Sequence, residues 1–387
     1  MPILNSVAAL HAEVTGWRQH LHENPELLYD VHETAAFVAA KLKAFGVDEI
    51  VTGIGKTGVV GVIRGRSTAS GRVIGMRADM DALPIEEITG LPYASKVKGK
   101  MHACGHDGHT SMLLGAAKHL AETRNFNGTA IVIFQPAEEG GAGGKAMCDD
   151  GMMARFGVQE VYGLHNMPGI PLGTIATRKG ALCAASDAVK IIVEGRGGHG
   201  AEPHKAIDTI VVACNIVMAL QTIVARNLDP LKSGVITVGA INSGHAANVI
   251  PQTAELRVTV RSQETAVQDM LEKRIKETAE GIARSYGAQA TVQYTRLYPP
   301  TVNHDMATDF AVRVAQDVAG QANVVSDTVP LMGSEDFSFM LNERPGNMIM
   351  LGNGDTPGCH HPAYDFNDAA IPLGVSYWVR LVEIGMP

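Results

Sequence analysis

The stretch TAIVIFQPAEE (residues 129–139) contains the pattern on which the predicted fold depends. It begins with a short, mostly apolar run, which is typical of a strand buried inside a sheet, and it ends in two adjacent glutamates. Ligands of open α/β sheets gather outside the carboxyl ends of the strands. The stretch therefore predicts an α/β sheet with an acidic group at one edge.

The segments around this strand repeat the same alternation of strands and helices. VIGMRAD (73–79) and VQEVYGLHN (158–166) have the composition of buried strands, and GHTSMLLGAAKHLAE (108–122) has that of a helix. Further elements expected in the same layer are helices at about 6–21 and 33–44, strands at 59–64 and 347–351, a helix from 304 and a helix at the end of the chain. This order predicts an α/β sheet with helical crossovers.

The middle of the chain has a different pattern. Its expected elements are strands at 187–195, 234–241, 254–261 and 289–296 and helices at 205–226 and 264–286. The order β-α-β-β-α-β is that of a ferredoxin-like unit. We therefore predict a discontinuous α/β domain (1–184 and 298–387) and an inserted ferredoxin-like α+β satellite domain (185–297).

Length, charge and cysteine content limit the class of protein. A chain of 387 residues is long enough for two domains with separate cores. Its net charge of -8, without a run of lysine or arginine, argues against a nucleic-acid-binding surface. No signal-peptide or membrane-span pattern is visible, and five scattered cysteines do not form a disulfide framework. We expect a cytoplasmic protein that binds small molecules and neither nucleic acid nor a membrane.

The turn MHACGHDGHTSM (101–112) concentrates potential metal ligands before a predicted helix. Cys104 and His106 offer a thiolate and an imidazole, which are common ligands of zinc-like ions. Short motifs often occur by chance, so a helix-capping turn is the alternative for this stretch alone. His109 lies at helical spacing beyond His106 and is expected to support the turn.

Other strand ends add ligands to this turn. Asp79, the pair Glu138–Glu139, His165 and the pair at 360 and 361 each follow a predicted strand. Adjacent glutamates can divide two tasks, because one carboxylate can hold a metal ion while the other takes a proton from water. The alternative for the pair is a solvated acidic strand end or a helix cap.

Several longer motifs closely resemble those of one enzyme family, in order and over essentially the whole chain. They are MRADMDALPIEE (76–87), MHACGHDGHTSMLLGAA (101–117), QPAEEG (135–140), GLHN (163–166), GGHGAEPH (197–204), ANVIP (247–251), GSEDF (333–337) and HHPAYDFND (360–368). The family is that of the metal-dependent N-acyl-amino-acid amidohydrolases, the branch of the two-metal metallopeptidases that includes hippurate hydrolases, aminoacylases and auxin-conjugate hydrolases. The resemblance implies a catalytic domain with a dinuclear metal site and a satellite domain that mediates dimerisation.

The resemblance also implies roles for individual residues. Glu138 would be the general base, and Asp79 would orient a ligand from outside the metal site. The implied metal ligands are Cys104, His106, Glu139, His165 and His360. Alignment through YDFND favours His360 over its neighbour His361 without excluding the latter.

Two departures from the wider family leave the identity of the metal open. Arg77 occupies a position where wider relatives have a histidine ligand, and Cys104 occupies that of an aspartate that bridges the metals. The expected cofactor is therefore two divalent ions per subunit, with zinc, manganese and nickel as the candidates.

Three residues of the satellite domain have implied roles in substrate binding. His199 would polarise the substrate carbonyl, and Asn248 and Arg261 would hold the substrate carboxylate, for which the planar fork of arginine is suited. The alternatives are a loop histidine facing water, an asparagine that satisfies loop carbonyls and an arginine in a strand-edge salt bridge. The resemblance further implies a homodimer in which His199 acts on the metal site of the partner subunit.

The predicted function is hydrolysis of an N-acyl amino acid to a carboxylic acid and a free amino acid. A dipeptidase or carboxypeptidase of the same architecture is the nearer alternative. A non-enzymatic metal-binding protein is the more distant one, since both glutamates are present. The acyl group and the amino acid are not specified by the sequence.

Overall fold

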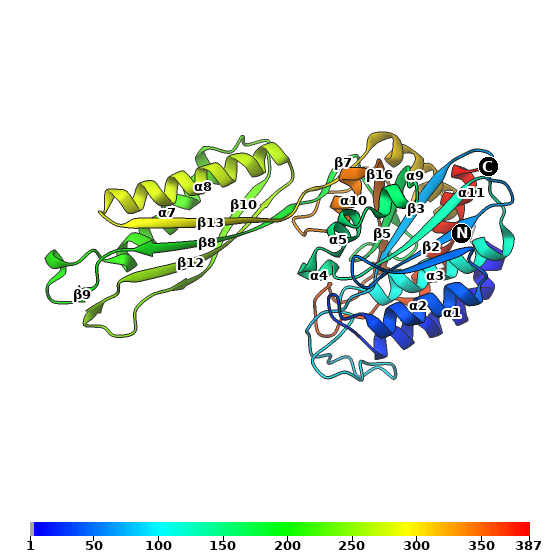
Figure 1. Cartoon of the computed structure of the whole chain (residues 1–387), viewed down its shortest axis with the longest axis horizontal. Helices are drawn as coiled ribbons and strands as arrows, with labels where there is room; N and C mark the ends of the chain where they lie inside the picture. Colours follow the sequence, from blue (N-terminus) through cyan, green and yellow to red (C-terminus); the bar gives the residue numbers. More distant parts are fainter. Residues whose placement is uncertain (1–3) are drawn as a thin grey trace. The chain divides into compact units, whose positions relative to one another are not determined.

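The computed structural model describes residues 4–387, which divide into two compact units (Figure 1). The first unit runs up to Leu182 and resumes at Val302–Val329 and Asp336–Pro387. The second consists of Cys183–Thr301 and the short segment Pro330–Glu335. Each unit has its own sheet and its own hydrophobic core.

The segment Pro330–Glu335 packs within the second unit. Leu331 forms a parallel bridge with Cys183, and the amide of Ala184 donates to the carbonyl oxygen of Gly333 at 2.9 Å. The sequence boundaries assigned these residues to the other domain, because no periodicity marks a six-residue return of the chain.

The first unit is built on an eight-stranded mixed sheet, which agrees with the predicted α/β class. Its strand order is β1-β2-β4-β3-β5-β16-β6-β15. The central pairs β3–β4, β3–β5 and β5–β16 are parallel, whereas β1–β2, β2–β4 and β6–β16 are antiparallel. The strands are β1 (Glu49–Ile54), β2 (Gly58–Arg64), β3 (Val73–Asp79), β4 (Thr129–Gln135), β5 (Glu160–Pro168), β6 (Ile175–Ala176), β15 (Val324–Val325) and β16 (Gly346–Gly354).

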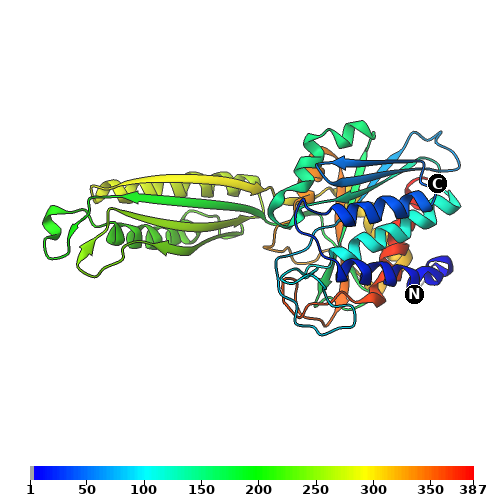
Figure 2. The same ribbon diagram turned by 60° about the horizontal axis from the view of Figure 1, so that its bottom comes forward.

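Helices cover this sheet on both faces. The main core joins α1, α3, α9 and α11 to one face, and Figure 2 brings α1, α2 and α3 forward as the blue and cyan helices. Gly163 of β5 points away from that core and lies against Phe337 of α10, so α10 packs on the opposite face. The helices are α1 (Asn5–Glu23), α2 (His32–Ala44), α3 (His106–Thr123), α4 (Glu138–Gly141), α5 (Gly143–Asp149), α6 (Met152–Arg155), α9 (Asp305–Ala319), α10 (Phe337–Glu343) and α11 (Ile371–Gly385).

The second unit has the element order β8-α7-β10-β12-α8-β13 and an antiparallel sheet of order β10-β12-β8-β13. Alternate residues of its strands, such as Val189 and Leu256, form one core with both helices. Its elements are β8 (Ala185–Glu194), β9 (Gly198–His199), α7 (Thr209–Arg226), β10 (Gly234–Asn242), β11 (Val249–Ile250), β12 (Thr253–Ser262), α8 (Thr265–Ser285) and β13 (Gln289–Tyr298). Two short strands, β7 (Gly180–Cys183) and β14 (Thr301–Asn303), form a separate pair.

The predicted helix at 205–226 begins four residues later than expected. Asp208 caps α7, because its side chain accepts hydrogen bonds from the amides of Ile210 and Val211 at 3.0 and 3.3 Å. The preceding residues Pro203–Lys205 form a 3-10 turn instead. The apolar periodicity that predicts the helix does not distinguish such a turn from a first helical turn.

The parallel strands bring the sequence motifs to one edge of the large sheet. Asp79 at the end of β3 is in register with Gln135 at the end of β4, and His165 of β5 is in register with Met350 of β16. The loops that follow these strands therefore meet at their carboxyl ends, where an α/β sheet holds its ligands.

Candidate active site

The turn before α3 is held in a narrow space. Gly105 has φ 89°, and a Cβ atom there would lie 2.2 Å from Oδ1 of Asn166, so this position accepts only glycine. The next residue, His106, starts α3 and lies with Nδ1 2.7 Å from the carbonyl oxygen of Asp81. This contact fixes the orientation of the imidazole ring and leaves its Nε2 atom available to bind a metal ion.

The two glutamates lie in a strained turn after β4. Ala137 adopts φ 54°, a conformation that side chains other than glycine rarely take and that concentrates at functional sites. The amides of Glu138 and Glu139 donate to Oδ1 and Oδ2 of Asp81 at 2.9 and 3.1 Å. Glu138 is 7% exposed, so the alternative of a solvated strand end is excluded.

Two groups of potential ligand atoms share Cys104. Its sulfur lies 3.4 Å from Nε2 of His165, and these atoms form one group with His106 in which all members lie within 4.8 Å of one another. The sulfur belongs to a second group with Glu139 and His360, whose members satisfy the same limit. One thiol therefore stands between two sets of possible metal ligands.

The structure distinguishes the two adjacent histidines. Nε2 of His360 lies 3.2 Å from Oε1 of Glu139, and the residue adopts φ 66°. His361 is exposed, and its Nδ1 accepts a hydrogen bond from the amide of Ala363 at 3.0 Å. Only His360 of this pair belongs to the cluster of potential ligands.

The loop that carries His360 also brings a second cysteine to the cluster. The amide of His360 donates to the carbonyl oxygen of Ala103 at 2.7 Å, which aligns the two chain segments. The side chains of Cys104 and Cys359 influence each other, and this interaction is the main cause of a raised pKa at Cys104 and a lowered pKa at Cys359. The sequence analysis did not identify Cys359, because its position matches no ligand spacing.

His109 supports the site by contacting Asp79 and Asn166, which lie near the carboxyl ends of β3 and β5. Its Nδ1 lies 2.7 Å from Oδ1 of Asp79, and its Nε2 lies 2.7 Å from Oδ1 of Asn166. Asn166 in turn donates to the hydroxyl of Tyr364 at 2.6 Å. Both nitrogens of His109 are therefore engaged, which agrees with its predicted supporting role.

Asp79 is held as a buried anion. Burial alone would raise its pKa, but the guanidinium of Arg77 and the imidazoles of His106 and His109 hold the pKa of Asp79 well below its usual range. Nη1 of Arg77 donates to Oδ2 of Asp79 at 2.8 Å, and the same oxygen lies 3.7 Å from Nε2 of His106. The carboxylate of Asp79 thus lies beside His106, a possible metal ligand, without belonging to either group that contains Cys104.

Arg77 connects Asp79 to a second buried acid. The guanidinium donates to Oε1 of Gln135 at 2.8 Å and to Oδ1 of Asp336 at 3.0 Å. Asp336 also accepts the amide of Gly144 at 2.7 Å. No role was predicted for Asp81 or Asp336, although both lie within the motifs MRADMDALPIEE (76–87) and GSEDF (333–337) that carry the family resemblance.

The residues present fit a divalent transition metal. Nε2 of His106 is buried and has no hydrogen-bond partner within residues 4–387, and it lies among a thiol, a second imidazole and two carboxylates. Thiolate, imidazole and carboxylate are the ligands that zinc-like ions take in proteins.

The satellite residues lie in the second unit. His199 on β9 is exposed and pairs with Val249 of β11, and the amide of Gly200 donates to the carbonyl oxygen of Asn248 at 2.8 Å. Arg261 lies on β12, where Nη1 donates to the hydroxyl of Thr259 at 2.6 Å. Among the residues that the structure describes, no ion pair to Arg261 is found, so the strand-edge salt bridge is not formed.

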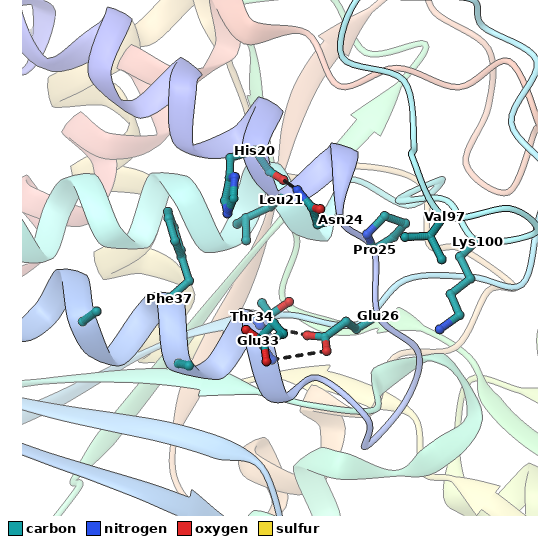
Figure 3. A pocket seen from close by; sticks show the side chains of 12 residues that line it. His20, Leu21, Asn24, Pro25, Glu26, Glu33, Thr34, Phe37, Val97 and Lys100 are labelled. Carbon is teal, nitrogen blue, oxygen red and sulfur yellow. Dashed lines mark hydrogen bonds between the residues drawn. The ribbon is translucent and has the colours of Figure 1, made fainter.

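A separate pocket of about 600 Å³ lies between α1 and α2 (Figure 3). Its lining includes His20, Phe37 and Lys100, and it includes none of the predicted site residues. Figure 3 shows Glu26 next to Glu33 and Thr34, whose amides donate to its carboxylate in the first turn of α2. This pocket is therefore distinct from the site that the predicted residues form.

Comparison with known proteins agrees with this geometry. The model of the peptidase family M20/M25/M40 matches residues 75–384. The chain is 44% identical to the hippurate hydrolase of Campylobacter jejuni, over 98% of both chains, and 42% identical to thermostable carboxypeptidase 1 of Saccharolobus solfataricus, over 90% of this chain and 89% of that one.

Among solved structures, the chain resembles a Bacillus subtilis protein described as a dinuclear metal binding peptidase of the M20 family. The TM-score is 0.85 and the identity 34%, with 98% of this chain and 99% of that chain covered. The matched family model and the near full-length relatives carry one conclusion: the chain belongs to peptidase family M20/M25/M40.

Proposed function

We propose that this protein hydrolyses the amide bond of N-acyl amino acids and releases a carboxylic acid and a free amino acid. The observation that carries the proposal is the buried Glu138 beside two groups of potential ligands that share Cys104. The similarity to a hippurate hydrolase supports an acyl amino acid as the substrate class.

The proposed cofactor is a pair of divalent ions per subunit. Cys104, His106 and His165 would hold one, and Cys104, Glu139 and His360 would hold the other. Such ions, when bound, polarise a carbonyl group and lower the pKa of water. Zinc, manganese and nickel are the candidates, because imidazole suits zinc and nickel, thiolate suits zinc, and the carboxylate of Glu139 suits manganese.

Glu138 is the proposed general base. The carboxylate of Asp81 accepts the backbone amides of both glutamates and so fixes their backbone. This keeps Glu138 close to His106 and Glu139. In this position it would take a proton from the attacking water and deliver it to the leaving amine. Asp79 would act indirectly, by maintaining a negative charge beside His106 and His109.

The satellite residues are proposed to bind the substrate from two different subunits. His199 and Asn248 lie beyond the end of β12 that begins at Thr253, whereas Arg261 lies eight residues further along the same strand. At about 3.4 Å per residue this separation is roughly 27 Å, longer than an N-acyl amino acid. We therefore assign His199 and Asn248 to the site of the partner subunit, to which they would bring a carbonyl-polarising and a carboxylate-binding group.

The second unit has a surface suited to a second copy of the chain. Ile210, Val211, Cys214 and Met218 form an exposed apolar stripe on α7, although the opposite side of this helix is buried in the satellite core. α7 covers β10, which is an edge strand of the satellite sheet. An apolar stripe beside an open edge supports the proposed homodimer, because a symmetric partner would cover both.

The apolar character of α7 has a second explanation. This helix is long and apolar enough to cross a membrane, by length and composition alone. Its buried side packs on the satellite sheet through residues such as Ile216 and Leu220, as in the core helix of a folded domain. We infer that α7 serves dimerisation.

The cysteines of the chain bear on its location. All five are free thiols, which suits the expected cytoplasmic location.

Turnover of benzoyl-glycine and of glycyl-glycine by the metal-loaded protein would test the proposal. We expect hydrolysis of benzoyl-glycine and little of glycyl-glycine, because the acyl group of the latter carries a charged amine where benzoyl-glycine has an apolar phenyl ring. Extending the assay to acetyl, indole-acetyl and longer acyl amino acids would identify the acyl preference.

The 42% identity to a carboxypeptidase favours one alternative. Preferential release of the C-terminal residue from longer acyl peptides would support that activity over the proposed one. Absence of turnover for every substrate, with metal bound, would instead support a non-enzymatic metal-binding protein.

A further inference from the structure

The two cysteines at the cluster lie in segments that are held together by the backbone. Cys104 precedes α3, and Cys359 lies in the loop after β16. The hydrogen bond from the amide of His360 to the carbonyl oxygen of Ala103 joins these segments next to both cysteines. Cys104 and Cys359 adjoin this bond on the two segments, so two cysteines from distant parts of the sequence lie next to each other, and each side chain shifts the pKa of the other.

The surroundings of the pair allow a reagent to enter. Cys359 is half-buried and lies between the exposed residues Gly358 and His360. Cys104 is 8% exposed and therefore less accessible than Cys359. A small oxidant would therefore meet Cys359 first and then find Cys104 beside it.

The loop around Cys359 can adjust to a covalent bond. Residues 355–363 form no helix or strand, and a Cβ atom at Gly358 would meet nothing within 4 Å. A disulfide requires Cα atoms about 4.4–6.8 Å apart and a restricted torsion, so an adaptable loop on one side favours its closure.

We propose that Cys104 and Cys359 form a reversible disulfide when a peroxide reaches them, and that this bond excludes metal from the cluster. The second part rests on the proposed function, in which the sulfur of Cys104 is a ligand of both ions. A sulfur atom engaged in a disulfide is no longer available as a thiolate ligand. Oxidation would thus remove one ligand from each group at once.

The reaction balances with hydrogen peroxide as the oxidant. The sulfur of Cys359 attacks one peroxide oxygen, the O–O bond breaks, and a sulfenic acid and one water form. The sulfur of Cys104 then attacks the sulfenic sulfur, so the S–S bond forms, the S–O bond breaks and a second water leaves. Two thiols lose two protons and two electrons, and the peroxide takes up all of them.

The first test uses the full chain stripped of metal and treated with hydrogen peroxide. We expect two of the five cysteines to become unreactive to a thiol reagent, and peptide mapping to find the peptides of Cys104 and Cys359 joined. Dithiothreitol should restore both thiols. If oxidation leaves these two peptides unjoined, the proposed disulfide is wrong, whatever the hydrolytic activity of the protein.

The second measurement is metal uptake by the oxidised protein, determined by elemental analysis after desalting. Uptake should fall by at least about tenfold and should return after dithiothreitol, because a ligand common to both groups is lost. A joined pair that takes up metal normally would contradict the exclusion and with it the assignment of Cys104 as a ligand. Metal-loaded protein should also form the disulfide at least about tenfold more slowly than stripped protein.

Two variants provide matched controls. Cys359→Ser removes the proposed partner and leaves Cys104 in place, so peroxide should produce no joined peptide. Cys214→Ser removes an exposed thiol of α7, and the joined peptide should form as in the wild type. Formation of a disulfide from Cys104 to another cysteine in Cys359→Ser would show that proximity to Cys359 is not the cause, and would overturn the inference.

Discussion

Nε2 of His360 lies 3.2 Å from Oε1 of Glu139, although the two residues follow strands that are not neighbours in the sheet. Glu139 follows β4 and His360 follows β16, and β3 and β5 lie between them. The contact therefore joins loops from two separated strands at the carboxyl edge of the sheet, and both side chains lie near the sulfur of Cys104. Glu138 belongs to no group with His360; it lies in a separate group with His106 and Glu139.

We predict that Glu138→Gln and Glu139→Gln separate turnover from metal binding. Glu138→Gln should lower kcat by about a hundredfold or more while the metal content stays unchanged, because only the proton acceptor is lost. Glu139→Gln should lose metal, because a neutral amide is a poor ligand for these ions. Elemental analysis and a steady-state assay on the same samples would measure both effects, and the reverse pattern would exchange the two roles.

Removal of metal should abolish hydrolysis of benzoyl-glycine. The proposed reaction depends on divalent ions, so a chelator followed by desalting should leave no activity, and added zinc, manganese or nickel should restore it. Circular dichroism of the stripped protein serves as the control for unfolding. Full activity in metal-free protein would end the proposed mechanism.

Mixed dimers should recover activity from two inactive variants. If His199 acts on the partner subunit, exchange of subunits between His199→Ala and Glu138→Ala would create one site with intact His199 and intact Glu138. Activity should rise toward a quarter of the wild-type value, since half of the dimers are mixed and each has one complete site. Native mass spectrometry would confirm exchange, and mixed dimers without activity would contradict action between subunits.

Replacement of Arg77 should destabilise the first unit. Arg77→Met leaves the buried carboxylates of Asp79 and Asp336 without their common cation, which typically costs about 3–5 kcal/mol. Arg77→Lys keeps the charge and loses the planar fork, so a smaller loss is expected. Urea denaturation would measure both, and equal stability of Arg77→Met and the wild type would show that the network contributes nothing.

The buried pair of His22 and Asp107 should make stability depend on pH. Burial opposes a charge on His22, but its hydrogen bond to Asp107 at 2.8 Å and the neighbouring Glu87 raise the pKa of His22 to about 9. A raised pKa in the folded state contributes stability that is fully present below about pH 6.5 and is lost as the pH rises through about 9.

The contribution of His22 is at most about 3 kcal/mol, as the shift in pKa implies. The free energy of unfolding of the wild type relative to His22→Gln should therefore decrease between about pH 6 and pH 10. Denaturant titrations at several pH values would measure it. A difference that stays constant over this range would mean that His22 is neutral in the folded protein.

Local sequence patterns predicted the elements that bury one continuous apolar face. β3, β4 and α3 appear where apolar runs and helical spacing place them, because burial dictates those residues. β1 was not predicted, since only one of its six residues is buried and its apolar and polar residues do not alternate clearly. The 3-10 turn before α7 and the return of Pro330–Glu335 to the second unit depend on tertiary contacts that no local period encodes.

The candidate site was predictable where a residue type carries its own chemistry. Cys104, His106 and the two glutamates were identified because few other side chains bind transition metals or move protons. No role was predicted for Asp81 or Asp336, because these carboxylates accept backbone amides and a guanidinium from residues remote in sequence. These hydrogen bonds join residues that are far apart in the sequence, so they can be recognised only in the folded structure.

The position of β16 has a consequence for how the chain folds during synthesis. β16 lies between β5 and β6 and is hydrogen-bonded to both, so until residues 346–354 emerge from the ribosome β5 has an open edge. The second unit, almost all of it within Cys183–Thr301, is complete earlier and can fold while the first is still unfinished. A nascent chain stalled before β16 should therefore bind chaperones through β5, and release past this strand should end that binding.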